Sequence, residues 1–202
     1  MKPSFIELAR PQVQSMKPYQ AGKPVEQAQR ELGIEKFVKL ASNENPRGPS
    51  AEVIAALNQA GQEVNRYPDA NGYYLKQILA EIHQVEAHCI TLGCGSNDIL
   101  ELIASAYLDQ YCSAVVSQYA FLVYGLAISR SGAATIEVPA LDYGHDLAAM
   151  NAAVLENTRV IYIANPKNPT GTYATCEELM ALLHGLSSSD LVVLDEAYCE
   201  YI

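Results

Sequence analysis

The chain has 202 residues, of which 50% are hydrophobic and 18% charged, and its formal net charge is -10 at pH 7. These proportions are typical of a folded globular protein and exclude a disordered chain. The negative charge argues against binding to nucleic acid or to an anionic membrane, because neither attracts an acidic surface.

The five cysteines are an odd number without a CxxC pair, so the sequence predicts neither a zinc site nor a closed set of disulfides. The four histidines are scattered without the spacing of metal ligands. Residues 1–10 lack the apolar segment of a signal peptide, and no run of about 18 apolar residues could span a bilayer. We therefore expect a cytoplasmic protein that binds no metal.

The first 49 residues are rich in proline and show little periodicity, which predicts an extended arm with one short helix at 25–32. Ser50 then has the character of an N-cap, followed by an apolar stripe that predicts a helix. A second helix is expected at 73–82, where apolar residues recur at helical spacing.

From residue 90 onward, apolar β-branched runs alternate with helical patterns, which predicts a mostly parallel sheet because each parallel strand needs a crossover. Thr175 and Glu178 form the pattern of a capping box at the start of the last helix. Strands are expected at 90–92, 114–117, 135–138, 160–163 and 191–194, and helices at 97–108, 120–129, 147–155 and 176–186.

Two polar motifs follow apolar strands near the end of the chain. The sequence Asn-Pro-Lys-Asn-Pro-Thr-Gly at 165–171 follows one strand, and Asp-Glu-Ala-Tyr at 195–198 follows another. Such sheets bind ligands at the carboxyl ends of their strands. An amide, a carboxylate and a phenol at that edge suit pyridoxal phosphate, whose ring nitrogen needs a carboxylate to stay protonated and whose phenolic oxygen needs a donor.

A glycine-rich segment, Gly93 to Asp98, lies between the strand at 90–92 and the helix at 97–108. Glycines let the backbone approach a ligand, and the first N–H groups of a helix face an anion, so the segment predicts a phosphate site. A dinucleotide site is the alternative, which the sequence disfavours because Asp98 stands where the third glycine belongs.

Each of these motifs also has a purely structural alternative. Tyr119 could stack on a cofactor ring or could be a tyrosine of the core. Asp195 could cap a helix or close a turn, and the residues at 165–171 favour turns by themselves. Their joint occurrence at one sheet edge favours a cofactor site.

Seven segments of the chain occur in the order found in one known family: residues 40–46, 66–69, 95–98, 117–121, 142–146, 165–171 and 195–201. Together they resemble the histidinol-phosphate aminotransferases, which are fold-type-I pyridoxal-phosphate enzymes. The resemblance runs from about Pro18 to Ile202. It implies an α/β fold, a mostly parallel sheet with flanking helices that is incomplete at its carboxyl end. It also implies an arm with part of a small domain at 1–49 and part of the cofactor-binding large domain at 50–202.

The resemblance implies roles for individual residues in binding the cofactor. Asp195 resembles the partner of the ring nitrogen, and Tyr119 resembles the aromatic residue that stacks on the ring. The turn that binds the cofactor phosphate is similar to Gly95, Ser96 and Asn97.

Other matches concern the phenolic oxygen, the substrate and a second subunit. Asn168 and Tyr198 resemble the donors to the phenolic oxygen. Tyr67 is similar to the tyrosine that reaches the phosphate bound by the neighbouring subunit, which implies a homodimer. Tyr19 and Asn43 match arm residues that lie near the substrate.

Two features depart from the family pattern. Lys167 replaces the asparagine commonest between the two Asn-Pro units, and we expect a tolerated change in a loop. Lys167 is not a candidate for the Schiff-base lysine, because it precedes the second Asn-Pro unit. In the family that lysine follows the Asp-x-x-Tyr block by roughly thirty residues. We therefore expect it beyond Ile202, and we expect this chain alone to lack the catalytic lysine and to be inactive.

The resemblance implies an enzyme of histidine biosynthesis that interconverts L-histidinol phosphate plus 2-oxoglutarate and imidazole-acetol phosphate plus L-glutamate, with L-histidinol phosphate formed in the forward direction. A related enzyme such as threonine-phosphate decarboxylase, or a non-catalytic truncated fragment, are the alternatives. By the family pattern, two strands that come later in the sequence lie between the strand at 90–92 and the strand at 191–194. We therefore expect the strand at 191–194 to border an unpaired edge.

Overall fold

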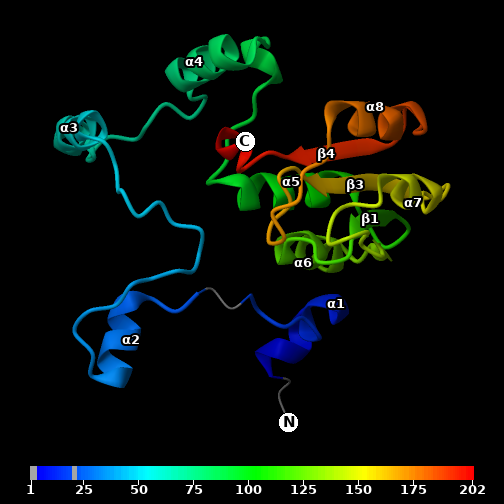
Figure 1. Ribbon diagram of the computed structural model, residues 1–202, viewed down its shortest axis with the longest axis horizontal. Coiled ribbons are helices and arrows are strands. Elements are labelled where there is room, and N and C mark those ends of the chain that lie inside the picture. Colours follow the sequence, from blue (N-terminus) through cyan, green and yellow to red (C-terminus); the bar gives the residue numbers. More distant parts are fainter. Residues whose placement is uncertain (1–3, 20–21) are drawn as a thin grey trace. The chain divides into compact units, whose positions relative to one another are not determined.

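The computed structural model describes residues 4–19 and 22–202, which form two compact units (Figure 1). One unit comprises the described residues of Met1–Pro18 together with Leu92–Ile202, and the other those of Tyr19–Thr91. The division between arm and large domain at residue 50 stays a prediction. No helix in the described ranges is long and apolar enough to cross a membrane.

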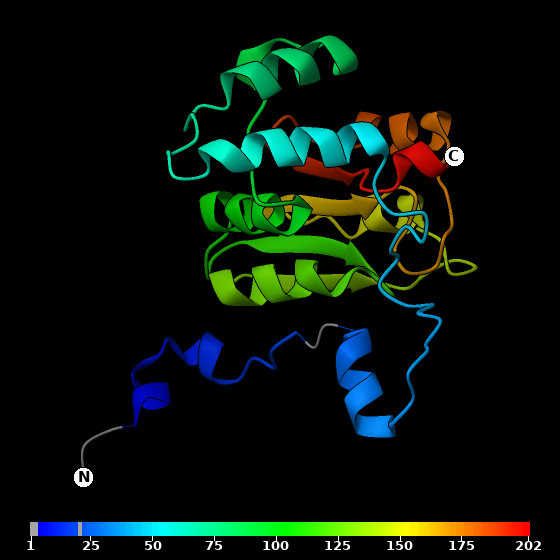
Figure 2. The ribbon, with the colours of Figure 1, turned by 90° about the vertical axis from the view of Figure 1, so that its left-hand side faces the viewer.

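A parallel sheet forms the centre of the first unit. Its strands lie in the order β2-β1-β3-β4, and Figure 1 labels β1, β3 and β4. Figure 2 shows the same sheet turned by 90°. Each strand lies within two residues of a range predicted from the apolar runs. Their bounds are β1 (Ser113–Ser117), β2 (Ala134–Val138), β3 (Thr158–Ala164) and β4 (Leu191–Asp195).

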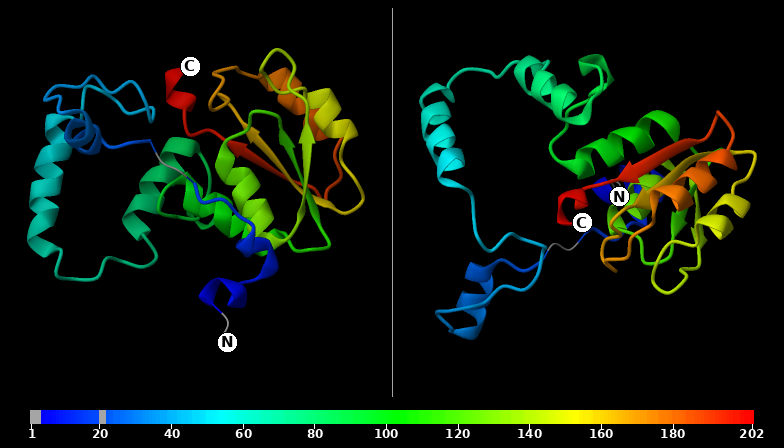
Figure 3. Two further views of the ribbon diagram at one scale, coloured as in Figure 1. Left: turned by 90° about the horizontal axis from the view of Figure 1, so that it is seen from below. Right: turned by 45° about the horizontal axis from the view of Figure 1, so that its top comes forward.

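Helices cover both faces of this sheet. Figure 3 (left) shows the green helices α5 and α6 on one face and the yellow to orange helices α7 and α8 on the other. The α/β fold class predicted from the sequence is therefore confirmed. The bounds are α5 (Ser96–Tyr107), α6 (Leu122–Ser131), α7 (Leu147–Ala152) and α8 (Cys176–His184). Two short helices, η1 (Phe5–Leu8) and α1 (Pro11–Gln14), precede them, and α1 contacts α6.

Alternate residues of β1 and β3 enter two separate cores, because successive side chains of a strand point to opposite faces. Both strands are covered on both sides, so they are apolar at nearly every position. The core under α5 and α6 includes Ala114, Val116, Tyr124, Val160 and Tyr162. The core under α7 and α8 includes Val115, Met150, Ile161, Ile163 and Leu182.

Strand β4 is an edge of the sheet, since it pairs only with β3 in the part of the chain that the structure describes. Every residue of β1 is buried, whereas those of β4 are half-buried or exposed. The unpaired edge expected beside residues 191–194 is therefore present.

The prediction of a strand at residues 90–92 is wrong. A short 3-10 turn, η3 (Ala87–Cys89), precedes these residues, which are irregular. A strand exists only where a neighbouring backbone accepts and donates its hydrogen bonds. Residues 90–92 have no such neighbour within the described residues, and their apolar character cannot replace one.

The predicted helix starts follow from local hydrogen bonds. Glu178 N donates to Thr175 Oγ1 at 3.3 Å, and Thr175 N donates to Glu178 Oε2 at 2.7 Å, which completes the capping box of α8. Ser50 Oγ accepts from Val53 N at 3.4 Å at the start of a helix of the second unit. Both caps satisfy N–H groups that have no partner inside a helix.

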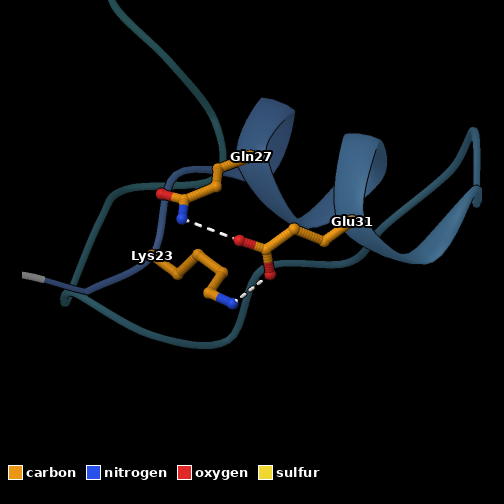
Figure 4. A network of polar contacts seen from close by, with 3 residues as sticks. All are labelled: Lys23, Gln27 and Glu31. Atoms are coloured by element: carbon orange, nitrogen blue, oxygen red, sulfur yellow. Dashed lines mark hydrogen bonds and ion pairs between the residues drawn. The ribbon is translucent and has the colours of Figure 1, made fainter.

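The unit Tyr19–Thr91 is held by local contacts, because none of its described residues is buried. Lys23 and Gln27 donate to the carboxylate of Glu31 at 2.5 and 2.8 Å (Figure 4), and these hydrogen bonds lower the pKa of Glu31. The helices predicted at 25–32 and 73–82 are confirmed. The elements of this unit are α2 (Val25–Leu32), α3 (Ala51–Ala60), η2 (Gly61–Glu63), α4 (Tyr73–His83) and η3.

Candidate cofactor site

A small cavity lies at the carboxyl edge of the sheet, beside the ends of β3 and β4 and the start of α5. Three segments far apart in sequence supply its predicted polar residues. It is lined by five of the residues predicted to bind a cofactor, Ser96, Asn97, Asn168, Asp195 and Tyr198. The other lining residues are Phe121, Ala164, Pro166 and Ala197.

The start of α5 presents backbone N–H groups that have no partner within the helix, while the Cys94 N–H just before it donates to Asp98 Oδ2 at 3.0 Å. Gly95 has φ +80°, a conformation that strains any residue with a Cβ atom. Ser96 and Asn97 then begin the helix, whose first N–H groups have no partner inside it. A Cβ atom on Gly93 would lie 2.8 Å from Ile99 Cδ1, so a larger residue there would require the Ile99 side chain to shift.

The segment at 165–171 is fixed by its own hydrogen bonds. Asn165 Nδ2 donates to the Ala174 carbonyl at 2.9 Å, and Asn165 Oδ1 accepts from Ala174 N at 2.8 Å. Gly171, at φ +75°, donates its N–H to the Lys167 carbonyl at 2.7 Å. The peptide bonds before both prolines of the segment are cis. Asn165 therefore holds the turn, while Asn168 lines the cavity.

Lys167 lies in the interior, with only 2% of its surface exposed. Its ammonium nitrogen lies 2.8–3.2 Å from four oxygen atoms. None of these oxygens belongs to a carboxylate. Burial lowers the pKa of Lys167. That lysine is tolerated at this position in place of the usual asparagine stays a prediction. The Lys167 side chain lies in the interior and not on the surface. The four oxygens are Ser117 Oγ and the carbonyl oxygens of Gln118, Tyr143 and Gly144.

The carboxylate of Asp195 is held at both oxygens. Oδ2 accepts from the Tyr124 hydroxyl at 2.6 Å, and Oδ1 accepts from Ala197 N at 3.2 Å. The carboxylate therefore has a fixed orientation at the cavity that it lines. Sequence reasoning missed Tyr124, which lies 71 positions before Asp195 and looks like an ordinary apolar-face residue of its helix.

Two aromatic residues of the loop after β1 differ in their relation to the cavity. Phe121 lines it, whereas Tyr119 does not. Tyr119 is 48% exposed and lies instead beside Tyr143, with ring centroids 5.6 Å apart, and 6.0 Å from the Lys167 ammonium. Sequence reasoning missed Phe121, although its position two residues after Tyr119 in the same loop was a usable signal.

Three of the predicted site residues belong to the other unit. Tyr19, Asn43 and Tyr67 all fall within Tyr19–Thr91, which the structure describes by itself. Tyr67 is fully exposed. Their roles toward the substrate and a second subunit stay predictions. No group of three or more His, Cys, Asp or Glu side chains in the described residues is placed to hold a metal ion.

Residues 35–202, most of the chain, match the family described as Aminotransferase class I and II. The chain belongs to this family. It is similar to curated bacterial proteins over nearly its whole length. It is 50% identical to histidinol-phosphate aminotransferase 1 of Idiomarina loihiensis, over 98% of this chain and 54% of that protein. It is 52% identical to histidinol-phosphate aminotransferase 2 of Pseudomonas fluorescens, over 100% of this chain and 55% of that protein.

The chain thus spans about half the length of the curated relatives it matches. A similar solved structure is that of histidinol-phosphate aminotransferase from Sinorhizobium meliloti in complex with pyridoxal-5'-phosphate. The two share 31% sequence identity with a TM-score of 0.86, over 94% of this chain and 51% of the other. The family resemblance read from the ordered motifs is confirmed.

Proposed function

We propose that the protein is a histidinol-phosphate aminotransferase that uses pyridoxal phosphate, and that this chain supplies most of the cofactor site. The observation that carries the proposal is the single cavity lined by Ser96, Asn97, Asn168, Asp195 and Tyr198. A carboxylate, an amide, a phenol and a helix start match the polar groups of that cofactor. Relatives that are identical to this chain at about half of the aligned positions support the choice of substrate.

The polar residues fit the cofactor group by group. The Asp195 carboxylate lines the cavity, and a carboxylate beside the ring nitrogen favours a proton on that nitrogen. Asn168 and Tyr198 can donate to the phenolic oxygen, and the N–H groups at the start of α5 can hold the phosphate. When bound, pyridoxal phosphate supplies an electron sink for charge that develops on the substrate carbon.

We assign the face of the cofactor ring to Phe121 in place of Tyr119. Phe121 belongs to the lining of the cavity that holds Asp195, and its apolar ring offers a flat surface against a heteroaromatic ring. Tyr119 is the alternative, because it lies in the same loop after β1.

In the proposed reaction the amino group moves from L-histidinol phosphate to 2-oxoglutarate, giving imidazole-acetol phosphate and L-glutamate. Tyr19 and Asn43 are proposed to contact the substrate. Tyr67 is proposed to bind the phosphate of the cofactor held by a second subunit in a homodimer. The full exposure of Tyr67 in a single chain supports this role, because a residue that serves a partner must be free to reach it.

The test is an assay of the product of the whole reading frame, followed as glutamate formed from L-histidinol phosphate and 2-oxoglutarate. We expect turnover, and a loss of about 100-fold or more in Asp195→Asn, because an amide cannot stabilise a protonated ring nitrogen. Asp190→Asn is the matched control, since Asp190 accepts from Ser187 N in the loop before β4 and does not line the cavity.

Other outcomes identify the alternatives. Release of carbon dioxide from threonine phosphate, without glutamate formation, would favour the decarboxylase. Binding of pyridoxal phosphate without any turnover would favour a non-catalytic fragment. Absence of cofactor binding by calorimetry would reject the proposal itself.

A further inference from the structure

Tyr124 is buried on α6, with 1% of its surface exposed, and its hydroxyl donates to Asp195 Oδ2 at 2.6 Å. The other carboxylate oxygen of Asp195 accepts from the Ala197 N–H. A carboxylate held at both oxygens cannot rotate freely. Tyr124 therefore determines which lone pairs of Asp195 remain available to the cavity.

Two aromatic contacts hold Tyr124 in place. Its ring stacks on Tyr162 of β3, with centroids 4.9 Å apart and planes 13° apart. The same ring meets Phe121 edge to face, at 5.8 Å and 89°. Burial, and then the hydrogen bond to Asp195, raise the pKa of Tyr124, so the phenol stays protonated and remains a donor.

A phenol is suited to this position because it is a neutral donor. A lysine or arginine beside Asp195 would also fix the carboxylate, but its positive charge would compete with a protonated ring nitrogen for the same negative charge. Tyr124 orders the carboxylate without adding a positive charge that would compete with a cation in the cavity. None of the residues that line the cavity with Asp195 carries a positive charge.

We propose that Tyr124 is a positioning residue, which aims the Asp195 carboxylate at the ring nitrogen of the cofactor and holds Phe121 against the ring. This inference rests on the proposed function, because it takes Asp195 as the partner of that nitrogen. It goes further by assigning a role to a residue that does not line the cavity.

The test compares Tyr124→Phe with Tyr162→Phe. Both changes remove one hydroxyl from the same stacked pair and keep both rings. The Tyr124 hydroxyl contacts Asp195, whereas the Tyr162 hydroxyl is buried without a hydrogen-bond partner in the described part of the chain. A role in packing alone affects both variants, and a role in positioning Asp195 affects only the first.

Two measurements are made on each variant. The first is the dissociation constant of pyridoxal phosphate by calorimetry, and the second is the ¹³C resonance of the Asp195 carboxyl in the unliganded protein. We expect Tyr124→Phe to weaken binding about tenfold, the scale of a hydrogen bond to a charged group, and to move the resonance. Tyr162→Phe should leave binding within about twofold and the resonance in place.

The Asp195→Ala background separates positioning from packing. There, Tyr124→Phe should cause no further loss of binding, because the acceptor that it serves has been removed. An equal loss in both backgrounds, equal effects of the two hydroxyl deletions, or an unmoved carboxyl resonance in Tyr124→Phe would each overturn the inference.

Two further outcomes are possible: the parent protein does not bind the cofactor, or the Tyr124→Phe variant does not fold. If the parent protein does not bind pyridoxal phosphate, the proposed function fails, and with it the role assigned here, whatever the carboxyl resonance shows. If Tyr124→Phe does not fold, 3-fluorotyrosine at position 124 replaces it as a stronger donor. The Asp195 resonance should then move in the opposite sense to that expected for loss of the hydroxyl, and an unmoved resonance would overturn the inference.

Discussion

The Lys167 ammonium donates to the carbonyl oxygen of Gln118 at 2.8 Å, so a residue that follows β3 holds the loop that follows β1. The same ammonium contacts the carbonyl oxygens of Tyr143 and Gly144 in the loop after β2. One side chain therefore joins three loops at the carboxyl edge of the sheet. Carbonyl dipoles take the place of water around the charge, which makes this buried cation tolerable without a carboxylate.

Lys167→Met should lower the free energy of unfolding by about 2–4 kcal/mol, because the methionine keeps most of the apolar stem but leaves buried oxygens without a donor. Urea denaturation measures the change. Lys36→Met, at an exposed lysine, is the control and should stay within about 0.5 kcal/mol of the parent. A loss of similar size in both variants would show that the four oxygens do not depend on Lys167.

Phe121→Leu should weaken binding of pyridoxal phosphate about threefold to tenfold, since leucine keeps an apolar contact but loses the ring-to-ring interaction. Tyr119→Leu should change the dissociation constant by less than about twofold, because Tyr119 lies outside the cavity lining. Calorimetric titration of both variants with pyridoxal phosphate measures the two dissociation constants. A larger loss of affinity in Tyr119→Leu than in Phe121→Leu would show that Tyr119 stacks on the cofactor ring.

The pH dependence of stability should carry a contribution from His145. Its Nε2 donates to the Ala164 carbonyl at 2.9 Å, while its buried Nδ1 has no partner among the described residues. Burial lowers the pKa of His145, so below about pH 6.5 the unfolded chain takes up a proton before the folded one does. The stabilisation is complete above that pH and is lost as the pH falls.

His145→Gln should therefore show a smaller drop in unfolding free energy between pH 7.5 and 5.5 than the parent, by up to about 1 kcal/mol. His184→Gln, at an exposed histidine near the end of α8, is the control and should retain the drop of the parent. Equal drops in all three proteins would mean that His145 takes up its proton at the same pH in the folded and unfolded states.

The proposed role of Tyr67 across a dimer can be tested with mixed dimers. A subunit with Tyr67→Phe is paired with a subunit that carries Asp195→Asn. If Tyr67 serves the partner, one site keeps both native residues and the other loses both, so half of the sites should bind pyridoxal phosphate with parental affinity. If Tyr67 serves its own subunit, each site loses one native residue and no site should bind with parental affinity.

The parts of the fold that could be predicted from the sequence are those fixed by local interactions. The apolar runs of β1 and β3 and the capping box at Thr175 each contain their own structural signal. The strand predicted at 90–92 failed because strand formation depends on a neighbour that local sequence does not encode.

The site shows the same limit. Asn168 and Asp195 could be predicted because their motifs are contiguous, and the structure brings both to one cavity. Tyr124 could not be predicted, because its role depends on a contact across 71 positions that only the packing of α6 against the sheet creates. The choice between Tyr119 and Phe121 likewise depends on which way a short loop turns.

Asp195 is the last residue of β4, a strand with a neighbour on one side only in the described ranges. Such a strand separates from its sheet at a lower free energy than a central strand such as β1, so its amide hydrogens exchange with solvent earlier. A ligand that needs the Asp195 carboxylate binds the closed form alone and makes opening rarer. Occupancy of the cavity would then slow amide exchange along β4 while leaving β1 unchanged, which makes the edge of this sheet a reporter of its own ligand.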